Sequence, residues 1–242
     1  ARQQGELVHP RKRVEMNVAM QRVFTLAAMA LVLVSSAAAA EITPADFQRV
    51  VDEAYAKYKG LNEGSNADYI PILTETPSDL FGVVIVTRKG AVYSAGDVDY
   101  KFSIQSVSKP FTAALVMTQQ GPNALREKIG LESTGLPFNS KLSLEIHKAR
   151  SVNPLVNAGA IASVSMIEAK SEKDRWNQVF ANISDFAGTK LTVLEKVYDS
   201  EYANVWSNRG IANLLYDYDR LYSDPEEALR VYTRQCSIGV NA

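Results

Sequence analysis

Ser106 and Lys109 form the only Ser-x-x-Lys in the chain, and they are its clearest candidates for chemistry. A serine hydroxyl hardly ionises near neutral pH, so it attacks a carbonyl carbon only when a base takes its proton. Residues three apart on a helix share one face, so the amine of Lys109 is expected beside the Ser106 hydroxyl. Burial lowers the pKa of a lysine, which makes it a suitable base. The spacing therefore predicts a serine nucleophile.

Pro110 indicates where the helix that carries this pair begins. Proline is tolerated in a helix only near the first turn, where its missing N–H leaves no hydrogen bond unmade. The helix is therefore expected to begin close to Ser106, at the positive end of its dipole, and to end before Gly121-Pro122. Free backbone N–H groups at that end are suited to stabilising an oxyanion.

Hydrophobic spacing and turn residues predict the remaining elements. An early hairpin followed by many helices indicates an α+β fold with an antiparallel sheet and a helical region. Gly210 lies inside one expected helix, where glycine costs about 1 kcal/mol relative to alanine. The expected elements are a helix capped by Thr43-Pro44, a hairpin of strands 81–87 and 91–95, a loop at 135–150, helices at 157–169, 171–187 and 201–218, and a helix that starts at 223–225.

The first forty residues have the pattern of an export signal. Basic residues at 11–13 and 22 precede an apolar run at 23–34, and four alanines end at Ala40. This order is typical of a Sec-type signal peptide, with cleavage between Ala40 and Glu41. The apolar run is shorter than the roughly 20 residues that span a bilayer, so we expect no stable membrane association after cleavage. Residues 1–40 are assigned to this signal and residues 41–242 to one mature domain.

Charge and residue counts exclude several classes of function. The chain has 26 basic and 27 acidic residues, which are interspersed, so nothing indicates a nucleic-acid partner. The histidines are His9 and His147 and the single cysteine is Cys236, which argues against a zinc site, a Ser-His-Asp triad and an internal disulfide. We therefore expect no metal and no cofactor. Cys236 is interpreted as a buried structural thiol, and His147 as a solvent-facing residue in a polar loop.

Several motifs occur in the order that is typical of one enzyme family. They are Asn-Ala-Asp-Tyr-Ile-Pro at 66–71, Gln-Ser-Val-Ser-Lys-Pro-Phe at 105–111, the segment 129–140, Asn-Pro-Leu-Val-Asn-Ala-Gly-Ala-Ile at 153–161, Ser-Glu at 200–201, Ser-Asn-Arg at 207–209, and Val-Tyr-Thr-Arg-Gln-Cys-Ser at 231–237. In this order they resemble the serine-dependent glutaminases, whose fold is similar to that of serine β-lactamases and penicillin-binding proteins. The resemblance runs from about Phe47 to the last residue. It implies a three-layer α/β/α arrangement, in which helices flank an antiparallel sheet beside a helical subdomain.

The resemblance also implies an activity. It predicts an amidohydrolase that converts L-glutamine to L-glutamate and ammonia through a γ-glutamyl ester on Ser106, without a cofactor. It further implies a homo-oligomer, either a dimer or a tetramer. The signal peptide predicts a periplasmic or secreted protein, and because many relatives are cytoplasmic, the cytoplasm is the alternative location.

Six residues match family positions that contact the substrate. Glu201 suits the α-ammonium group, and the asparagines offer amide donors and acceptors without adding charge. Glu201 and Asn208 are seven residues apart, nearly two helical turns, so both are expected to point into one pocket from a single helix. Tyr69 is expected to donate a hydrogen bond near the nucleophile, and joins Ser106 and Lys109 in the predicted catalytic set. The six positions are Tyr69, Ser106, Asn157, Glu201, Asn208 and Tyr232.

Five of these residues also have a purely structural interpretation. Glutamate is usually a solvated helix residue, which would apply to Glu201. Asn157 would satisfy backbone groups where helices approach closely, and Asn208 would cap a helix. Tyr69 would be a packing residue, and Tyr232 would belong to the hydrophobic core. Both interpretations stay open at the level of the sequence.

Two further functional interpretations also stay open. A penicillin-recognising hydrolase or D-alanyl peptidase uses Ser-x-x-Lys as well, although no Ser-x-Asn or Tyr-x-Asn motif is convincingly placed here. The other is an inactive, truncated glutaminase. The chain stops at Ala242, within a segment that the family continues to a later tyrosine and a glycine-rich Lys-Ser-Gly strand. We expect poor solubility in that case, because exposed sheet edges associate.

Overall fold

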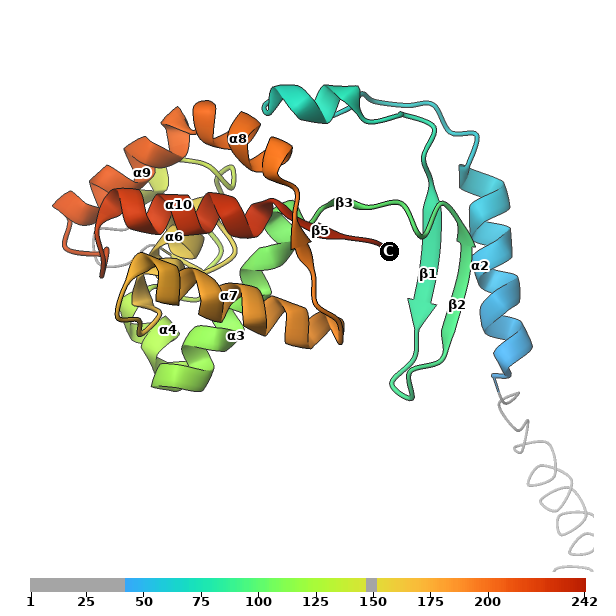
Figure 1. The fold of residues 1–242 in the computed structure, drawn as a ribbon, viewed down its shortest axis with the longest axis horizontal. Helices are drawn as coiled ribbons and strands as arrows, with labels where there is room; N and C mark the ends of the chain where they lie inside the picture. Colours follow the sequence, from blue (N-terminus) through green and yellow to red (C-terminus); the bar gives the residue numbers. More distant parts are fainter. Residues whose placement is uncertain (1–41, 147–151) are drawn as a thin grey trace, which may run out of the picture. The chain divides into compact units, whose positions relative to one another are not determined.

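The computed structural model describes residues 42–146 and 152–242, and Figure 1 shows their elements. The chain divides into two units, residues 1–47 and 48–242. The described end of the first unit begins helix α2 (Pro44–Tyr58). There the Thr43 N–H donates to Asp46 Oδ2 over 3.0 Å and the Asp46 N–H to Thr43 Oγ1 over 3.4 Å, which confirms the predicted helix start. The expected signal peptide and His147 lie outside the described residues.

The predicted hairpin is present. Strands β1 (Gly82–Val86) and β2 (Val92–Gly96) pair antiparallel, with Gly82 opposite Gly96. Gly90 closes the turn with a φ of 81°, a left-handed conformation that favours glycine. Tyr55 of α2 stacks on Phe81 just before β1, with ring centroids 5.9 Å apart. This ring pair fastens α2 to the hairpin.

A second sheet joins segments that are far apart in the sequence. Its strand order is β3–β5–β4, and both pairs are antiparallel. Strand β3 (Phe102–Ser103) leads directly into the turn that carries Ser106, β4 is Thr192–Val193, and β5 (Ile238–Val240) follows the last helix. Antiparallel strands together with many helices confirm the predicted α+β class.

The helices gather around α6, as Figure 1 shows. Every residue of α6 is buried, and α3, α9 and α10 pack against it. Gly159 lets the segment just before α6 lie close to the helix, because a Cβ at Gly159 would lie 1.8 Å from the backbone oxygen of Asn153. The helical segments are η1 (Pro71–Glu75), η2 (Gln105–Ser108), α3 (Lys109–Gln120), α4 (Pro122–Lys128), α5 (Leu142–Ile146), α6 (Asn157–Met166), α7 (Glu172–Ala187), α8 (Glu195–Ala203), α9 (Trp206–Asp217) and α10 (Pro225–Cys236).

Three sequence predictions about these elements were wrong. The expected loop at 135–150 contains the short helix α5, and the helix predicted at 157–169 ends at Met166. The single helix predicted at 201–218 is two helices, α8 and α9, with a break at Asn204. Asn204 ends α8 because its side chain donates to the Ser200 carbonyl oxygen over 2.8 Å, an alternative to continuing the helix.

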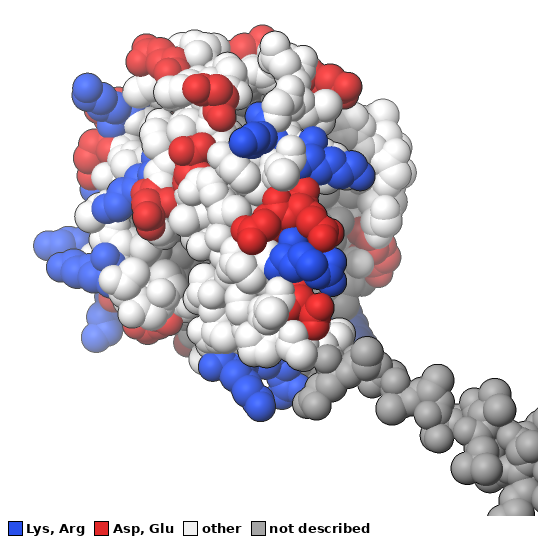
Figure 2. All heavy atoms as spheres, turned by 90° about the vertical axis from the view of Figure 1, so that its right-hand side faces the viewer, with Lys and Arg blue, Asp and Glu red and all other residues white. Residues whose placement is uncertain are grey.

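Surface charge and helix length are the features that relate to a nucleic-acid partner and to a membrane. On the face that Figure 2 shows, basic and acidic side chains are interspersed. Across residues 42–146 and 152–242, no helix is long and apolar enough to cross a membrane.

Candidate active site

One cavity of about 280 Å³ collects all six residues that were matched to substrate-contacting positions. Tyr69 precedes η1, Ser106 comes from η2, and Asn157 is the first residue of α6. Glu201, Asn208 and Tyr232 come from α8, α9 and α10. Six separate segments therefore converge on one small space.

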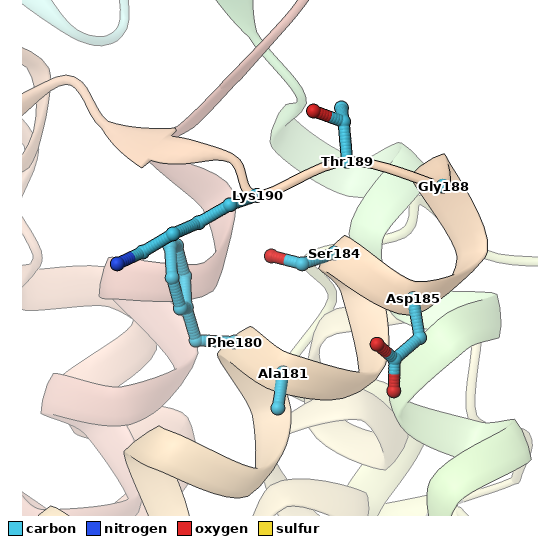
Figure 3. Close-up of a pocket in the computed structure, with 7 residues that line it drawn as sticks. All are labelled: Phe180, Ala181, Ser184, Asp185, Gly188, Thr189 and Lys190. Carbon is cyan, nitrogen blue, oxygen red and sulfur yellow. The ribbon is translucent and has the colours of Figure 1, made fainter.

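A larger cavity, of about 530 Å³, lies at the C-terminal end of α7 and is shown in Figure 3. Ser184 points toward its centre in that view, while Thr189 points away. Its two charged residues, Asp185 and Lys190, are exposed, and it contains none of the predicted site residues. Exposed charges are well solvated, so the smaller cavity is the better candidate for catalysis.

The turn that presents Ser106 has an unusual backbone. Gln105 has a φ of 49°, in the left-handed region that non-glycine residues rarely adopt. Its carbonyl oxygen accepts a hydrogen bond of 2.7 Å from Ser108 Oγ, and its side chain donates to Ser103 Oγ over 3.1 Å. Such strain persists only where neighbouring bonds hold it. The prediction that the helix begins close to Ser106 is confirmed, since η2 leads directly into α3.

Lys109 is buried beside the cavity, with 3% of its surface exposed. Its amine donates to Asn157 Oδ1 over 2.8 Å, and among the described residues no hydrogen bond joins it to Ser106. Burial lowers the pKa of Lys109, while negative charge on Cys236 and Glu201 would raise it. A lysine with a lowered pKa is a candidate base.

Asn157 forms side-chain hydrogen bonds to three other predicted site residues. Its Oδ1 accepts from the Lys109 amine and, over 3.2 Å, from the Tyr232 hydroxyl. Its Nδ2 donates to Asn208 Oδ1 over 2.9 Å. These bonds determine which way the Asn157 amide faces, because only its oxygen can accept from Lys109 and only its nitrogen can donate to Asn208.

Glu201 is the carboxylate of the cavity and is 8% exposed. Burial raises its pKa to about 7, although a hydrogen bond from Gln105 and the charge of Lys109 lower it. The Gln105 contact is long, at 3.5 Å from Nε2 to Glu201 Oε2. A carboxylate whose ionised form is destabilised by burial is strongly stabilised by a cationic ligand in the same cavity.

The purely structural interpretation is wrong for three of the predicted site residues and stays open for a fourth. Glu201 is not solvated, and Asn208 is not a cap, because Val205 holds the N-cap position of α9. Tyr69 is 65% exposed at the cavity and is not a core packing residue. Tyr232 fits both interpretations, since it is 2% exposed and also bonds Asn157.

Eight residues that line the cavity were not predicted as site residues, and two of them, Gln105 and Cys236, also contact the site's polar groups. Gln105 contacts Glu201, and Cys236 lines the cavity as well as being buried. The Cys236 thiol lies 4.0 Å from Ser108 Oγ, and burial raises its pKa far above the usual range. The prediction that this thiol is buried is confirmed. Both residues stand inside the motifs at 105–111 and 231–237, but their types alone indicated no role.

The arrangement is suited to a small organic molecule that has a carbonyl group and a cationic group. Ser106 is a candidate nucleophile, Lys109 a candidate base and Glu201 a partner for the cation. In the part of the chain that the structure describes, no group of three or more His, Cys, Asp or Glu side chains could hold a metal ion.

Comparison with known proteins identifies close relatives. The family model described as Glutaminase matches residues 64–242. The glutaminase of Colwellia psychrerythraea is 52% identical over 193 residues, which cover 80% of this chain and 62% of that protein. The chain thus spans about three fifths of the length of this relative.

Solved structures agree with the fold. One, described as the probable glutaminase ybaS, matches with a TM-score of 0.81 and 46% identity, covering 83% of this chain and 65% of that one. Another, Mglu in its glutamate form, matches with a TM-score of 0.75 and 34% identity, covering 80% and 45%. These matches confirm the fold class that the resemblance implied.

Proposed function

Since this chain belongs to the glutaminase family, we propose that it hydrolyses L-glutamine to L-glutamate and ammonia. The observation that carries this proposal is one cavity in which Ser106, Glu201 and Asn208 meet beside the buried Lys109. A relative, Mglu, is described in a glutamate form, and glutamate is the product expected here.

Substrate binding follows from the charges in the cavity. Ionised Glu201 pairs with the α-ammonium of glutamine, a charge-assisted contact in a buried setting. The amides of Asn157 and Asn208 hold the polar atoms of the substrate without adding charge. Asn157 is itself held by Lys109 and Tyr232, so the cavity is organised before the substrate arrives.

The chemistry is acyl transfer from nitrogen to oxygen. Ser106 Oγ attacks the carbonyl carbon of the side-chain amide, and Lys109 accepts the serine proton once its amine turns from Asn157. That proton passes to the leaving nitrogen as the carbon–nitrogen bond breaks, which releases ammonia. Water then hydrolyses the γ-glutamyl ester and frees Ser106. Tyr69 supplies a phenolic hydrogen bond at the exposed side of the cavity.

The test is ammonia release from L-glutamine by the purified chain. We expect release that disappears in Ser106→Ala and is far weaker with L-asparagine, whose side chain is one methylene shorter. Release that survives Ser106→Ala would contradict the serine mechanism, and a folded chain without release would contradict glutaminase activity for this polypeptide. Acylation by benzylpenicillin, seen as a mass increase at Ser106, would favour the penicillin-recognising alternative.

We also propose that the protein is exported and assembles as a dimer or tetramer. The basic and apolar pattern of residues 1–40 supports export, and the family resemblance supports assembly. Sequencing the N-terminus of the periplasmic protein tests the first, with Glu41 as the expected first residue. Light scattering tests the second, and a monomer at all concentrations would contradict it.

A further inference from the structure

Two helices that form walls of the candidate active site, α8 and α9, are joined by a short turn that we call the corner. Glu201 lies on α8 and Asn208 on α9, and only Asn204 and Val205 separate these helices. Both corner residues also line the cavity. The angle between the helices therefore decides whether Glu201 and Asn208 can reach the same ligand.

One carboxylate accepts hydrogen bonds from both α8 and α9, on the side of the corner that faces away from the cavity. Glu226, in the first turn of α10, accepts a hydrogen bond of 2.9 Å from the Tyr202 hydroxyl of α8. It also accepts from Arg209 of α9, with Nε at 2.6 Å from Oε1 and Nη2 at 3.3 Å from Oε2. Tyr202 directly follows Glu201, and Arg209 directly follows Asn208.

Because each contact residue is the direct neighbour of a site residue, a contact to Glu226 can fix the position of that site residue. Successive residues of a helix point about 100° apart, so Tyr202 and Arg209 face away while their neighbours face the cavity. The guanidinium of Arg209 also lies 5.6 Å from the Tyr202 ring and 5.0 Å from the Trp206 ring. Arg209 is thus held by a carboxylate and by aromatic rings at once, which restricts its rotamers.

Glu226 remains charged under ordinary conditions. Its bond from Arg209 lowers the pKa of its carboxyl group, and the hydroxyl of Tyr202 adds to this effect. The side chains of Arg209 and Glu226 are 26% and 40% exposed, so water reaches the pair only in part. A bidentate contact of this kind has a defined geometry that a single exposed ion pair lacks.

We propose that Glu226 is a positioning residue that holds α8 and α9 at the angle at which Glu201 and Asn208 bind one substrate molecule. Glu226 does not line the cavity, so it acts only through Tyr202 and Arg209. Because α10 also carries Tyr232, the same carboxylate ties three walls of the cavity together. This inference rests on the proposed glutaminase function for its substrate, although the helix contacts stand independently.

The neighbouring residue Glu227 provides a matched control. It lies in the same first turn of α10 and accepts from Arg175 Nε over 2.9 Å. Arg175 belongs to α7, which supplies no residue to the cavity lining, and this ion pair is the more buried one, with side chains 7% and 21% exposed. Glu227→Gln therefore removes an equal charge from a more buried ion pair, without releasing α8 or α9.

The first arm of the test is steady-state kinetics with L-glutamine. We expect Glu226→Gln to raise KM about tenfold with kcat within about twofold, as for loss of ground-state positioning. Tyr202→Phe, which keeps the ring and loses only the hydroxyl bond, should raise KM about threefold, in line with a single hydrogen bond. Glu227→Gln should leave KM within about twofold. Equal increases in KM for Glu226→Gln and Glu227→Gln would overturn the proposal, and so would a fall in kcat with unchanged KM.

The second arm is hydrogen exchange of the backbone amides, which needs no turnover. Glu226→Gln should speed exchange in α8 and α9 and leave α7 unchanged, while Glu227→Gln should do the reverse. Uniform exchange changes in both variants would overturn the proposal even if the kinetics agreed. If the parent chain releases no ammonia, the proposed function fails, and the exchange pattern alone decides whether Glu226 holds the corner. Tyr202→Phe serves the same purpose if Glu226→Gln does not fold.

Discussion

The amine of Lys109 lies 2.8 Å from Oδ1 of Asn157, so a buried lysine is held by a neutral amide and not by a carboxylate. A carboxylate in that place would stabilise the cation strongly and keep its proton bound. The amide satisfies the amine without this effect. Asn157 therefore leaves the pKa of Lys109 lowered by burial, which is the direction that a catalytic base requires.

Replacing this amide by a carboxylate should disable the base. Asn157→Asp keeps the shape and adds a negative charge beside the amine, so the pKa of Lys109 should rise. We expect kcat at pH 7 to fall about 100-fold and its rise with pH to move to higher pH. The measurement is the pH profile of kcat. An unchanged profile would show that Lys109 is not the base.

Glu201 should control substrate affinity at low pH. Its pKa of about 7 means that the free carboxyl group becomes protonated below that pH and loses its attraction for an α-ammonium. We expect kcat/KM for L-glutamine to fall about tenfold for each pH unit below 7, as for one essential ionised group. Since a bound ammonium favours the charged form, kcat itself should fall only at lower pH. A flat kcat/KM between pH 5 and 8 would exclude this role for Glu201.

The same carboxyl group should destabilise the empty protein at high pH. An acid whose pKa is raised on folding leaves stability unaffected below its unfolded pKa and lowers it as pH rises toward its folded pKa. Glu201→Gln should therefore raise the free energy of unfolding by up to about 3 kcal/mol at pH 8 and hardly at pH 4, since one pKa unit corresponds to about 1.4 kcal/mol. Thermal unfolding at both pH values measures this, and equal gains at both would refute a charge effect.

Two glycines should respond to alanine in opposite directions. A Cβ at Gly159 would lie 1.8 Å from the backbone oxygen of Asn153, so Gly159→Ala should destabilise by about 3 kcal/mol or more and displace Asn157. A Cβ at Gly210 meets only the end of the Lys141 side chain, at 3.3 Å, inside α9. Gly210→Ala should therefore stabilise by about 0.5 to 1 kcal/mol through helix propensity. Denaturant unfolding checks both, and a loss of stability at Gly210 would mean that α9 requires the glycine.

Elements whose causes are local followed from the sequence. The Ser171 side chain accepts the Asp174 N–H at the start of α7, and Gly188 ends that helix with a φ of 64°. The Asp224 side chain accepts the Glu227 N–H at the start of α10 in the same way. All these bonds span three or four residues, so residue type and spacing are enough to predict them.

The family motifs likewise indicated the members of the cavity but not their contacts. Asn157, Glu201 and Asn208 were recognised because they stand in a characteristic order, and they do line one cavity. The sequence placed the last two on one helix, whereas they lie on two. The side chain of Asn204 bonds a carbonyl oxygen that could otherwise accept a helix hydrogen bond. The spacing of hydrophobic residues alone does not predict which of the two bonds forms.

Amino-acid sequence by itself determined the start of a helix close to Ser106, the hairpin and the capped helix ends, because each depends on interactions between near neighbours. Only the tertiary structure decided that the amine of Lys109 bonds Asn157, that Glu201 is buried, and that Glu226 joins α8 to α9. These relations connect residues 17 to 48 positions apart. They follow from how the helices pack around α6, and packing involves all of the segments at once.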